Sequence, residues 1–207
     1  MQNDLPFRAS GPLMRPLAVA ITGGIGAGKS EALAAFARHG AATVSSDEIV
    51  HRLLREDEDV RRRLVERFGD PILDDVGQLD RGAIAQLVFG DRKQLDWLER
   101  LLHPRVTHEY LDWREQLGRL PNPPRVAVTE VPLLYEVGGD ERFDKVVVIT
   151  APPELRAERS QAAGELREAR LLPDEEKARR ADFVYVNDGT LEELDAFVAD
   201  VMRKLTA

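Results

Sequence analysis

The sequence contains no cysteine. This absence excludes disulfide bonds and thiolate metal sites within the chain. No apolar run approaches the roughly 20 residues that a membrane-spanning helix requires, and residues 1–8 lack the apolar core of a signal peptide. We therefore expect no membrane association and a cytoplasmic location.

Basic residues are too few to outweigh the acidic ones. The chain has 29 lysines and arginines against 37 aspartates and glutamates, which gives a formal net charge of −8 at pH 7. A general nucleic-acid binder needs a broad basic face, so we expect no nucleic-acid partner. Any phosphate site must be a local positive pocket on an acidic body. With 207 residues, the chain can bury one substantial core and carry a small inserted subdomain.

A glycine-rich loop near the N-terminus is the most informative motif. The apolar run 17–22 predicts a buried strand, residues 23–30 read Gly-Gly-Ile-Gly-Ala-Gly-Lys-Ser, and a helical pattern begins at Lys29. This is the phosphate-binding P-loop pattern in its strand–loop–helix context. Glycines allow successive backbone N–H groups to point at a phosphate, Lys29 supplies charge to the outer phosphates, and Ser30 offers a hydroxyl to Mg²⁺. We expect ATP to be bound by Gly24, Ile25, Gly26, Ala27, Gly28, Lys29, Ser30 and Glu31.

Strands and helices alternate along much of the chain, and the strand candidates are short apolar runs rich in β-branched residues. This alternation predicts an α/β fold, in which a three-layer P-loop core holds a parallel sheet between helices. The strands are expected at 17–22, 41–44, 125–131, 145–150 and 183–186, and the helices of the core at 29–39, 48–55, 152–163 and after Thr190. On this last helix, Leu191, Leu194, Phe197, Val198 and Val201 are expected to face inward.

Residues 57–118 lack strand periodicity and are predicted to form a helical insertion packed over the sheet. Residues 1–16 show no period and are expected to be a flexible tail. The core then comprises 17–56 and 119–207. Within the insertion, helices are expected at 57–68, 84–89 and 92–102, with another long helix that starts at His103-Pro104.

Two acids follow predicted strands. Because the carboxyl ends of neighbouring parallel strands share one crevice, Asp47 is expected to face the phosphates. It could accept the proton of a phosphoryl-accepting hydroxyl, or it could cap its helix or help to hold Mg²⁺. Glu130 ends the third strand, where it is either an acid that organises a metal or an ordinary strand-end charge.

Arginines precede the last strand, and Asn187 follows it. Such arginines could clamp a transferring phosphoryl group, with Arg159 the favoured candidate and Arg167 the second. The alternative is a solvated helix whose arginines pair with neighbouring glutamates. Asn187, in an Asn-Asp-Gly turn, is expected to contact the nucleotide from the same crevice, although a plain turn fits the sequence equally well.

Taken in order, these motifs resemble those of the dephospho-coenzyme A kinase family, and the resemblance runs from about Leu17 to the C-terminal helix. The opening Thr-Gly-Gly-Ile-Gly of the P-loop is fairly distinctive, and four further segments fall in the order of that family. These segments are Gly77-Gln-Leu-Asp-Arg81, Leu98-Glu99 through His103-Pro104, Val131-Pro-Leu-Leu-Tyr-Glu136, and Ala181-Asp182 with Asn187-Asp-Gly189.

The resemblance implies ATP-dependent phosphorylation of the ribose 3′-hydroxyl of dephospho-coenzyme A, which gives coenzyme A and ADP. It assigns Asp47 as the base and places the acceptor at the helical insertion, with a lid at about 153–180. Lys29 and Arg159 would neutralise charge on the transferring group, and Ser30 would bind Mg²⁺. The residues implied near the acceptor are Asp47, Asp80, Arg81, His103 and Arg105.

Two departures from the family pattern stand out. Ser45 occupies the position of the first acid of the family's Asp-x-Asp motif, and the lid is several residues short. Arg167 can match an arginine of the family's lid, but Leu171 stands where a glutamine is expected four residues later. The sequence therefore leaves open which arginine reaches the transferring group.

The sequence leaves three alternatives to this function. A P-loop kinase of another small acceptor, such as a nucleoside monophosphate, is the main alternative. A regulatory nucleotide switch would need a guanine-reading Asn-Lys-x-Asp motif, which the sequence lacks. A non-catalytic nucleotide-binding module is a third alternative. The expected partners are small molecules only, and the expected assembly is a monomer or a weak homo-oligomer.

Overall fold

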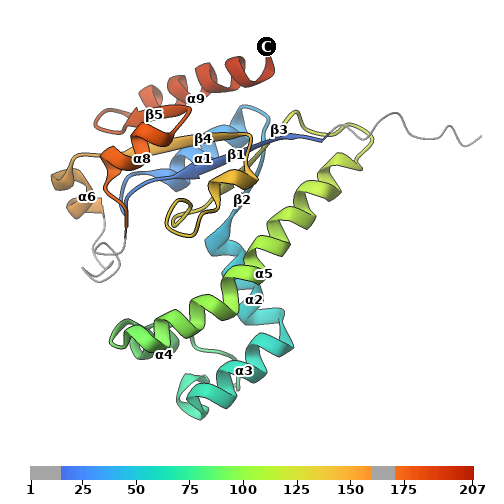
Figure 1. The fold of residues 1–207 in the computed structure, drawn as a ribbon, viewed down its shortest axis with the longest axis vertical. Helices are drawn as coiled ribbons and strands as arrows, with labels where there is room; N and C mark the ends of the chain where they lie inside the picture. Colours follow the sequence, from blue (N-terminus) through green and yellow to red (C-terminus); the bar gives the residue numbers. More distant parts are fainter. Residues whose placement is uncertain (1–14, 160–170) are drawn as a thin grey trace, which may run out of the picture.

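The computed structural model describes residues 15–159 and 171–207. Its five described strands form one parallel sheet in the order β2-β3-β1-β4-β5 (Figure 1). Each strand lies within one residue of its predicted bounds, and the α/β fold class is confirmed. The strands are β1 (Leu17–Thr22), β2 (Ala42–Ser45), β3 (Val126–Glu130), β4 (Lys145–Thr150) and β5 (Phe183–Val186).

Helices and a loop segment cover the two faces of this sheet. On one face, Ile21 and Val147 pack against Phe36 of α1 (Lys29–Arg38) and Val198 of α9 (Leu191–Thr206). On the other face, Ala20 and Val148 contact the segment that follows β3 and the residues that flank α8 (Asp174–Arg180). Residues on both faces are buried because alternate side chains of a strand point to opposite sides.

The last helix begins as the sequence predicts. The Thr190 side chain accepts the backbone N–H of Glu193, and the Glu193 carboxylate accepts that of Thr190, which completes a capping box. The inward stripe, however, starts one turn later than expected. Leu191 is 62% exposed, so its predicted inward orientation is wrong, and Met202 joins Leu194, Val198 and Val201 in the core instead.

The helical insertion extends from the sheet as a lobe (Figure 1), so it packs against the sheet only in part and does not cover it as predicted. Most of the lobe packs around a hydrophobic core of its own, which includes Leu64, Ile84 and Leu101. Side chains of two of its helices also join Val44 of the sheet and Phe143 in a smaller cluster. The helices of the lobe are α2 (Ser46–Glu56), α3 (Glu58–Phe68), α4 (Arg81–Phe89) and α5 (Arg92–Gly118).

α5 runs through the predicted break at His103-Pro104. It is 27 residues long and holds Pro104 in its interior, which removes a helical hydrogen bond and typically costs about 3 kcal/mol. Apolar burial on both sides of the proline offsets this cost, because Leu101 joins the core of the lobe and Val106 joins the cluster beside the sheet. The prediction that a helix starts at His103-Pro104 is therefore wrong, since tertiary packing overrides the local proline signal.

The helix predicted at 152–163 begins at Pro153 as α6 (Pro153–Arg159). Its predicted end, Arg167 and the central part of the expected lid lie outside the described residues. Residues 1–14 of the expected N-terminal tail do so as well. Of the expected lid, the structure describes only α6 and the residues from 171 to the end of α8.

Candidate active site

The crevice at the carboxyl ends of the strands gathers most of the predicted nucleotide-binding residues. β1 leads into the glycine loop, β2 into Asp47, β3 ends at Glu130, and β5 is followed by Asn187. All five strands are parallel, so these positions share one edge of the sheet. The prediction that the second strand would end in the same crevice as the glycine loop is confirmed.

The glycine loop adopts the backbone that its sequence predicts. Gly23, Gly26 and Gly28 have φ angles of 144°, 73° and 95°, a region that side chains with a Cβ rarely adopt. At Gly23 the approach of the chain also requires glycine, because a Cβ would lie 1.9 Å from the carbonyl oxygen of Ile149. The loop ends at Lys29, where α1 begins and presents its N-terminal N–H groups.

Lys29 is held inside this loop. Its side chain is buried, and Nζ donates to the carbonyl oxygen of Gly24 at 2.8 Å. Burial lowers the pKa of the Lys29 ammonium, and the carboxylates of Glu130 and Asp47 oppose that shift. The ammonium is therefore a desolvated charge at the loop, as a phosphate-binding lysine should be.

Glu130 is the acid that contacts the glycine loop directly. It is 5% exposed, and Ser30 Oγ donates to its Oε2 at 3.4 Å. Burial raises the pKa of the Glu130 carboxyl, Lys29 lowers it, and the negative charge of Asp47 raises it further. The sequence left open whether Glu130 organises a metal or is an ordinary charge at a strand end. Its burial at the end of a fully buried strand favours a role in the site.

Asp47 lies at the second position of α2 and is exposed. The helix cap is Ser45, whose side chain accepts the Asp47 backbone N–H at 3.2 Å. The alternative that Asp47 caps this helix is therefore wrong. The negative charge of Asp47 acts on the pKa values of Lys29 and Glu130, which it raises. The same contact gives the departure at Ser45 a structural role.

Arg156 is the arginine of α6 that contacts the glycine loop. A Cβ on Gly24 would lie 2.6 Å from Arg156 Nη1, and one on Gly26 would lie 2.7 Å from its carbonyl oxygen. The predicted candidate Arg159 instead donates from Nη1 to the carbonyl oxygen of Asn187 at 3.2 Å. Sequence reasoning favoured Arg159 because nothing in the local pattern distinguishes one arginine of a charged helix from another.

Asn187 binds the backbone of the glycine loop. It is buried, and its Nδ2 donates to the carbonyl oxygen of Ala27 at 2.9 Å. A Cβ on Gly28 would lie 2.2 Å from that nitrogen. This contact fixes the backbone of the glycine loop, which is a different task from the predicted contact with the nucleotide.

The residues predicted near the acceptor belong to the helical lobe. Asp80 caps α4 by accepting the backbone N–H groups of Gly82 and Ala83. Arg105 binds Asp59 at 2.5 Å and also faces Asp57, so its charge is engaged within the lobe. Arg81 is the exposed first residue of α4, and His103 lies within α5.

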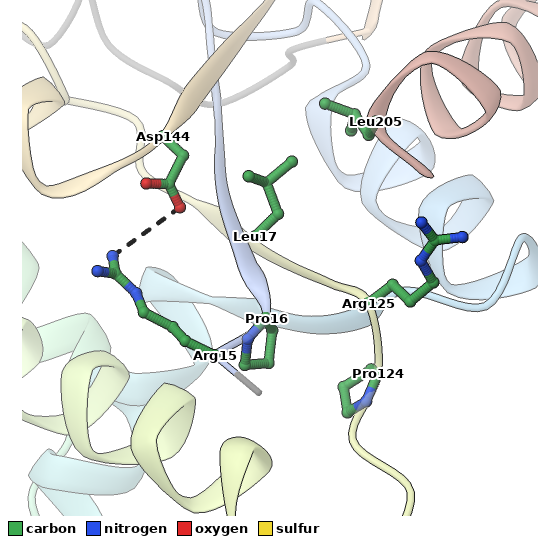
Figure 2. Close-up of a pocket in the computed structure, with 7 residues that line it drawn as sticks. All are labelled: Arg15, Pro16, Leu17, Pro124, Arg125, Asp144 and Leu205. Atoms are coloured by element: carbon green, nitrogen blue, oxygen red, sulfur yellow. Dashed lines mark ion pairs between the residues drawn. The ribbon is translucent and has the colours of Figure 1, made fainter. Parts of the chain in front are cut away.

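A pocket of about 360 Å³ lies at the opposite end of the sheet (Figure 2). Leu17 and Asp144 line it where β1 and β4 begin. Asp144 accepts the Ala18 backbone N–H at 2.8 Å and pairs with Arg15 at 3.9 Å. Figure 2 shows Arg125 on the far side of Leu17. The contacts of Asp144 thus hold the start of β1 in place, far from the glycine loop at the other end of that strand.

Among residues 15–159 and 171–207, no three histidine or acidic side chains lie close enough together to form a metal-binding group. Within the same ranges, every helix is too short or too polar to cross a membrane.

Comparison with known proteins agrees with the resemblance seen in the sequence. The family model described as dephospho-CoA kinase matches residues 17–193. The dephospho-CoA kinase of Protochlamydia amoebophila is 37% identical over 90% of this chain and 95% of its own length. The crystal structure of TT1252 from Thermus thermophilus has a TM-score of 0.74 at 34% identity, covering 93% of this chain and all of that one. The dephospho-CoA kinase structure from Campylobacter jejuni has a TM-score of 0.65 at 25% identity, covering 92% and 98%. The chain belongs to the dephospho-CoA kinase family.

Proposed function

We propose that this crevice transfers the γ-phosphoryl group of ATP to the ribose 3′-hydroxyl of dephospho-coenzyme A, with coenzyme A and ADP as products. The observation that carries the proposal is the place of Lys29, Glu130 and Asp47 at one edge of the parallel sheet, where Lys29 bonds to Gly24 of the glycine loop and Ser30 bonds to Glu130, in a chain from this family. Phosphoryl transfer depends mainly on positioning and electrostatic stabilisation, which these few groups can supply.

The glycine loop binds the phosphates of ATP. Its backbone N–H groups and the N-terminus of α1 (Lys29–Arg38) favour an anion. Lys29 neutralises charge on the outer phosphates, and the contact of Arg156 with Gly24 and Gly26 supports a second cation at the same place. Arg159 and Arg167 remain candidates to meet the transferring group when the lid closes over it.

Asp47 acts as the base in this proposal. As the acceptor oxygen bonds to the γ-phosphorus, the bond to the bridging oxygen breaks and ADP leaves with that electron pair. The proton of the 3′-hydroxyl passes to the Asp47 carboxylate. Its exposure at the start of α2 supports this role, since the acceptor must reach it from outside the sheet.

The oxygen donors in the crevice fit a Mg²⁺ ion. Ser30 Oγ and Glu130 Oε2 lie 3.4 Å apart, and magnesium in such sites is commonly bound by one or two protein oxygens together with phosphates and water. Ser30 would hold the ion, with Glu130 or Asp47 as the supporting acid. A bound Mg²⁺ would neutralise charge on the phosphates during transfer.

The acceptor is assigned to the helical lobe that includes residues 57–118. Asp80, Arg81, His103 and Arg105 are proposed to lie near it, although Asp80 and Arg105 also have structural contacts within the lobe. We further propose a cytoplasmic enzyme that is a monomer or a weak homo-oligomer, with small molecules as its partners.

The direct test is a coupled assay of ADP release with dephospho-coenzyme A beside several nucleoside monophosphates. Turnover is expected with dephospho-coenzyme A and not with the nucleotides. Brisk turnover with a nucleoside monophosphate and none with dephospho-coenzyme A would overturn the proposal. It would favour a kinase of the same fold that acts on another acceptor.

A further inference from the structure

A lysine on α8 is completely buried. Lys177 is 0% exposed, and its Nζ lies 2.8 Å from Glu136 Oε1 in the segment that follows β3. Lysine is almost never fully buried unless it is paired. A buried ion pair is also expensive to desolvate and seldom stabilises a fold more than well-packed apolar side chains would.

Glu136 binds the chain at two points. Its Oε1 accepts the backbone N–H of Leu172 at 2.9 Å in addition to facing Lys177. The carboxylate therefore ties both the residues that enter α8 and the middle of that helix to the segment that follows β3. Its other oxygen, Oε2, is buried with no hydrogen-bond partner among the described residues, so the pair is poorly explained by stability alone.

The last turn of α8 is tied to the same segment. Arg180 binds Asp140 at 3.0 Å, and its guanidinium carbon lies 4.1 Å from the centre of the Tyr135 ring. Tyr135 is itself nearly buried, and burial raises its pKa to about 12. α8 is thus fixed along its length to residues 135–140, which follow β3.

The first residue of α8 reaches the glycine loop. Asp174 Oδ2 accepts from Arg156 Nη1 at 2.8 Å, and both side chains are about four-fifths buried. A Cβ on Gly24 would lie 2.6 Å from Arg156 Nη1 and 3.2 Å from Asp174 Oδ2. The pair therefore lies directly against the loop that is proposed to bind the phosphates.

We propose that the Glu136–Lys177 ion pair is a positioning device for phosphoryl transfer, which fixes α8 so that Asp174 holds Arg156 over the glycine loop. The inference rests on the proposed function. Neither Glu136 nor Lys177 needs to touch a substrate, because each acts through the guanidinium of Arg156.

The test compares Lys177→Met, Arg156→Ala and the variant with both substitutions. The affinity for a non-hydrolysable ATP analogue is measured by calorimetry, and turnover is measured with dephospho-coenzyme A. Each single variant is expected to bind the analogue about tenfold more weakly, which is the scale of one charge-assisted hydrogen bond. The double variant is expected to be no worse than Arg156→Ala, because Lys177 acts through Arg156. Losses that add would overturn the inference.

A stable replacement of the pair separates positioning from folding. Glu136→Leu combined with Lys177→Met removes both charges and should keep the melting temperature near that of the parent. Weak analogue binding in this stable variant is the expected result, and parent-like binding would overturn the inference. The matched control is Lys145→Met, which breaks a partly exposed pair between the first residue of β4 and Asp182, which precedes β5, and should leave binding and turnover unchanged.

The two proposals fail in different ways. The binding measurement does not involve the acceptor, so the coupling between Lys177 and Arg156 can be read in any outcome of the turnover assay. A parent protein that shows no turnover with dephospho-coenzyme A would contradict the proposed function. Independent effects of Lys177 and Arg156 on the analogue would contradict the positioning device.

Discussion

The crevice and the helical lobe use charged side chains in opposite ways. In the lobe, the carboxylate of Asp59 pairs with Arg62, Arg63 and Arg105, and the Asp59 side chain remains 40% exposed. In the crevice, the residues Lys29 and Glu130 are at most 9% exposed. Burial lowers the pKa of Lys29 and raises the pKa of Glu130, so that it favours the neutral form of each side chain.

The two regions therefore differ in how much water their charges keep, and this difference bears on stability. Exposed ion pairs are screened by water and typically contribute about 0–1 kcal/mol each. Desolvated charges oppose folding and are characteristic of functional sites. We therefore expect that substituting a charge in the crevice lowers activity with little loss of stability. Substituting a contact in the lobe is expected to lower stability first.

The largest effect is expected at Lys29. Lys29→Met should lower turnover about 10³-fold, on the scale of removing a preorganised charge from an active site. The melting temperature should change little, because the lost hydrogen bond to Gly24 is offset by relief of a desolvated charge. Steady-state kinetics and thermal unfolding check both halves. A variant that loses stability and activity together would place Lys29 with the structural charges.

Asp47 comes next. Asp47→Asn is expected to keep the affinity for ATP while turnover falls at least about 10²-fold, because the amide cannot accept the hydroxyl proton. Stability should be unaffected, since the cap of α2 is Ser45. Ser45→Ala is the matched variant and should lower the free energy of unfolding by about 1 kcal/mol. Near-normal turnover of Asp47→Asn would refute its role as the base.

Glu130→Gln is expected to raise stability at neutral pH while it lowers activity, and the gain in stability should depend on pH. Burial raises the pKa of the Glu130 carboxyl above that of the unfolded chain, so the folded state binds more protons between these two values. Stability therefore falls as the pH rises through that window, and the loss persists at neutral pH. The variant should unfold at a higher temperature than the parent at pH 7, with the gap closing toward pH 4, while its turnover falls about tenfold because the metal site loses a supporting acid. Thermal melts across this pH range test the sign, and a gap that widens on acidification would reverse the argument.

The smallest effect is expected in the lobe. Asp80→Ala removes the cap of α4 and should cost about 1 kcal/mol of unfolding free energy, whereas Asp80→Asn should restore most of it. Denaturant unfolding measures this difference. A raised KM for dephospho-coenzyme A in the stable Asp80→Asn variant would support the proposed acceptor contact. An unchanged KM would leave Asp80 with the cap alone.

Much of the fold could be predicted because local signals agreed with the tertiary structure. Continuous β-branched runs such as 146–149 mark strands that are buried on both faces, and the glycine loop leaves few alternatives for its backbone. The exception is α5, in which the proline signal at Pro104 is local while the packing that overrides it is not. Leu191 was misplaced for a similar reason, because periodicity does not show where a helix first meets the sheet.

The site was less predictable than the fold. Arg156 contacts the loop because Asp174, 18 residues later, binds its guanidinium, and such a pairing leaves no periodic trace in the sequence. Arg105 shows the converse. The resemblance to the family implied an acceptor role for Arg105, but its contact with Asp59, 46 residues away, could not be inferred from the pattern. Long-range charge pairing is thus the step that sequence reasoning could not supply.

The continuity of α5 has a practical consequence for protein engineering. Its first half contributes Leu101 to the core of the lobe, and its second half contributes Val106 and Tyr110 to the cluster that also holds Val44 of the sheet. A graft that exchanged residues 57–118 with those of another kinase would therefore cut away part of the interior next to the sheet. The lobe is not a cassette, and chimeras that aim to change the acceptor should keep the far end of this helix.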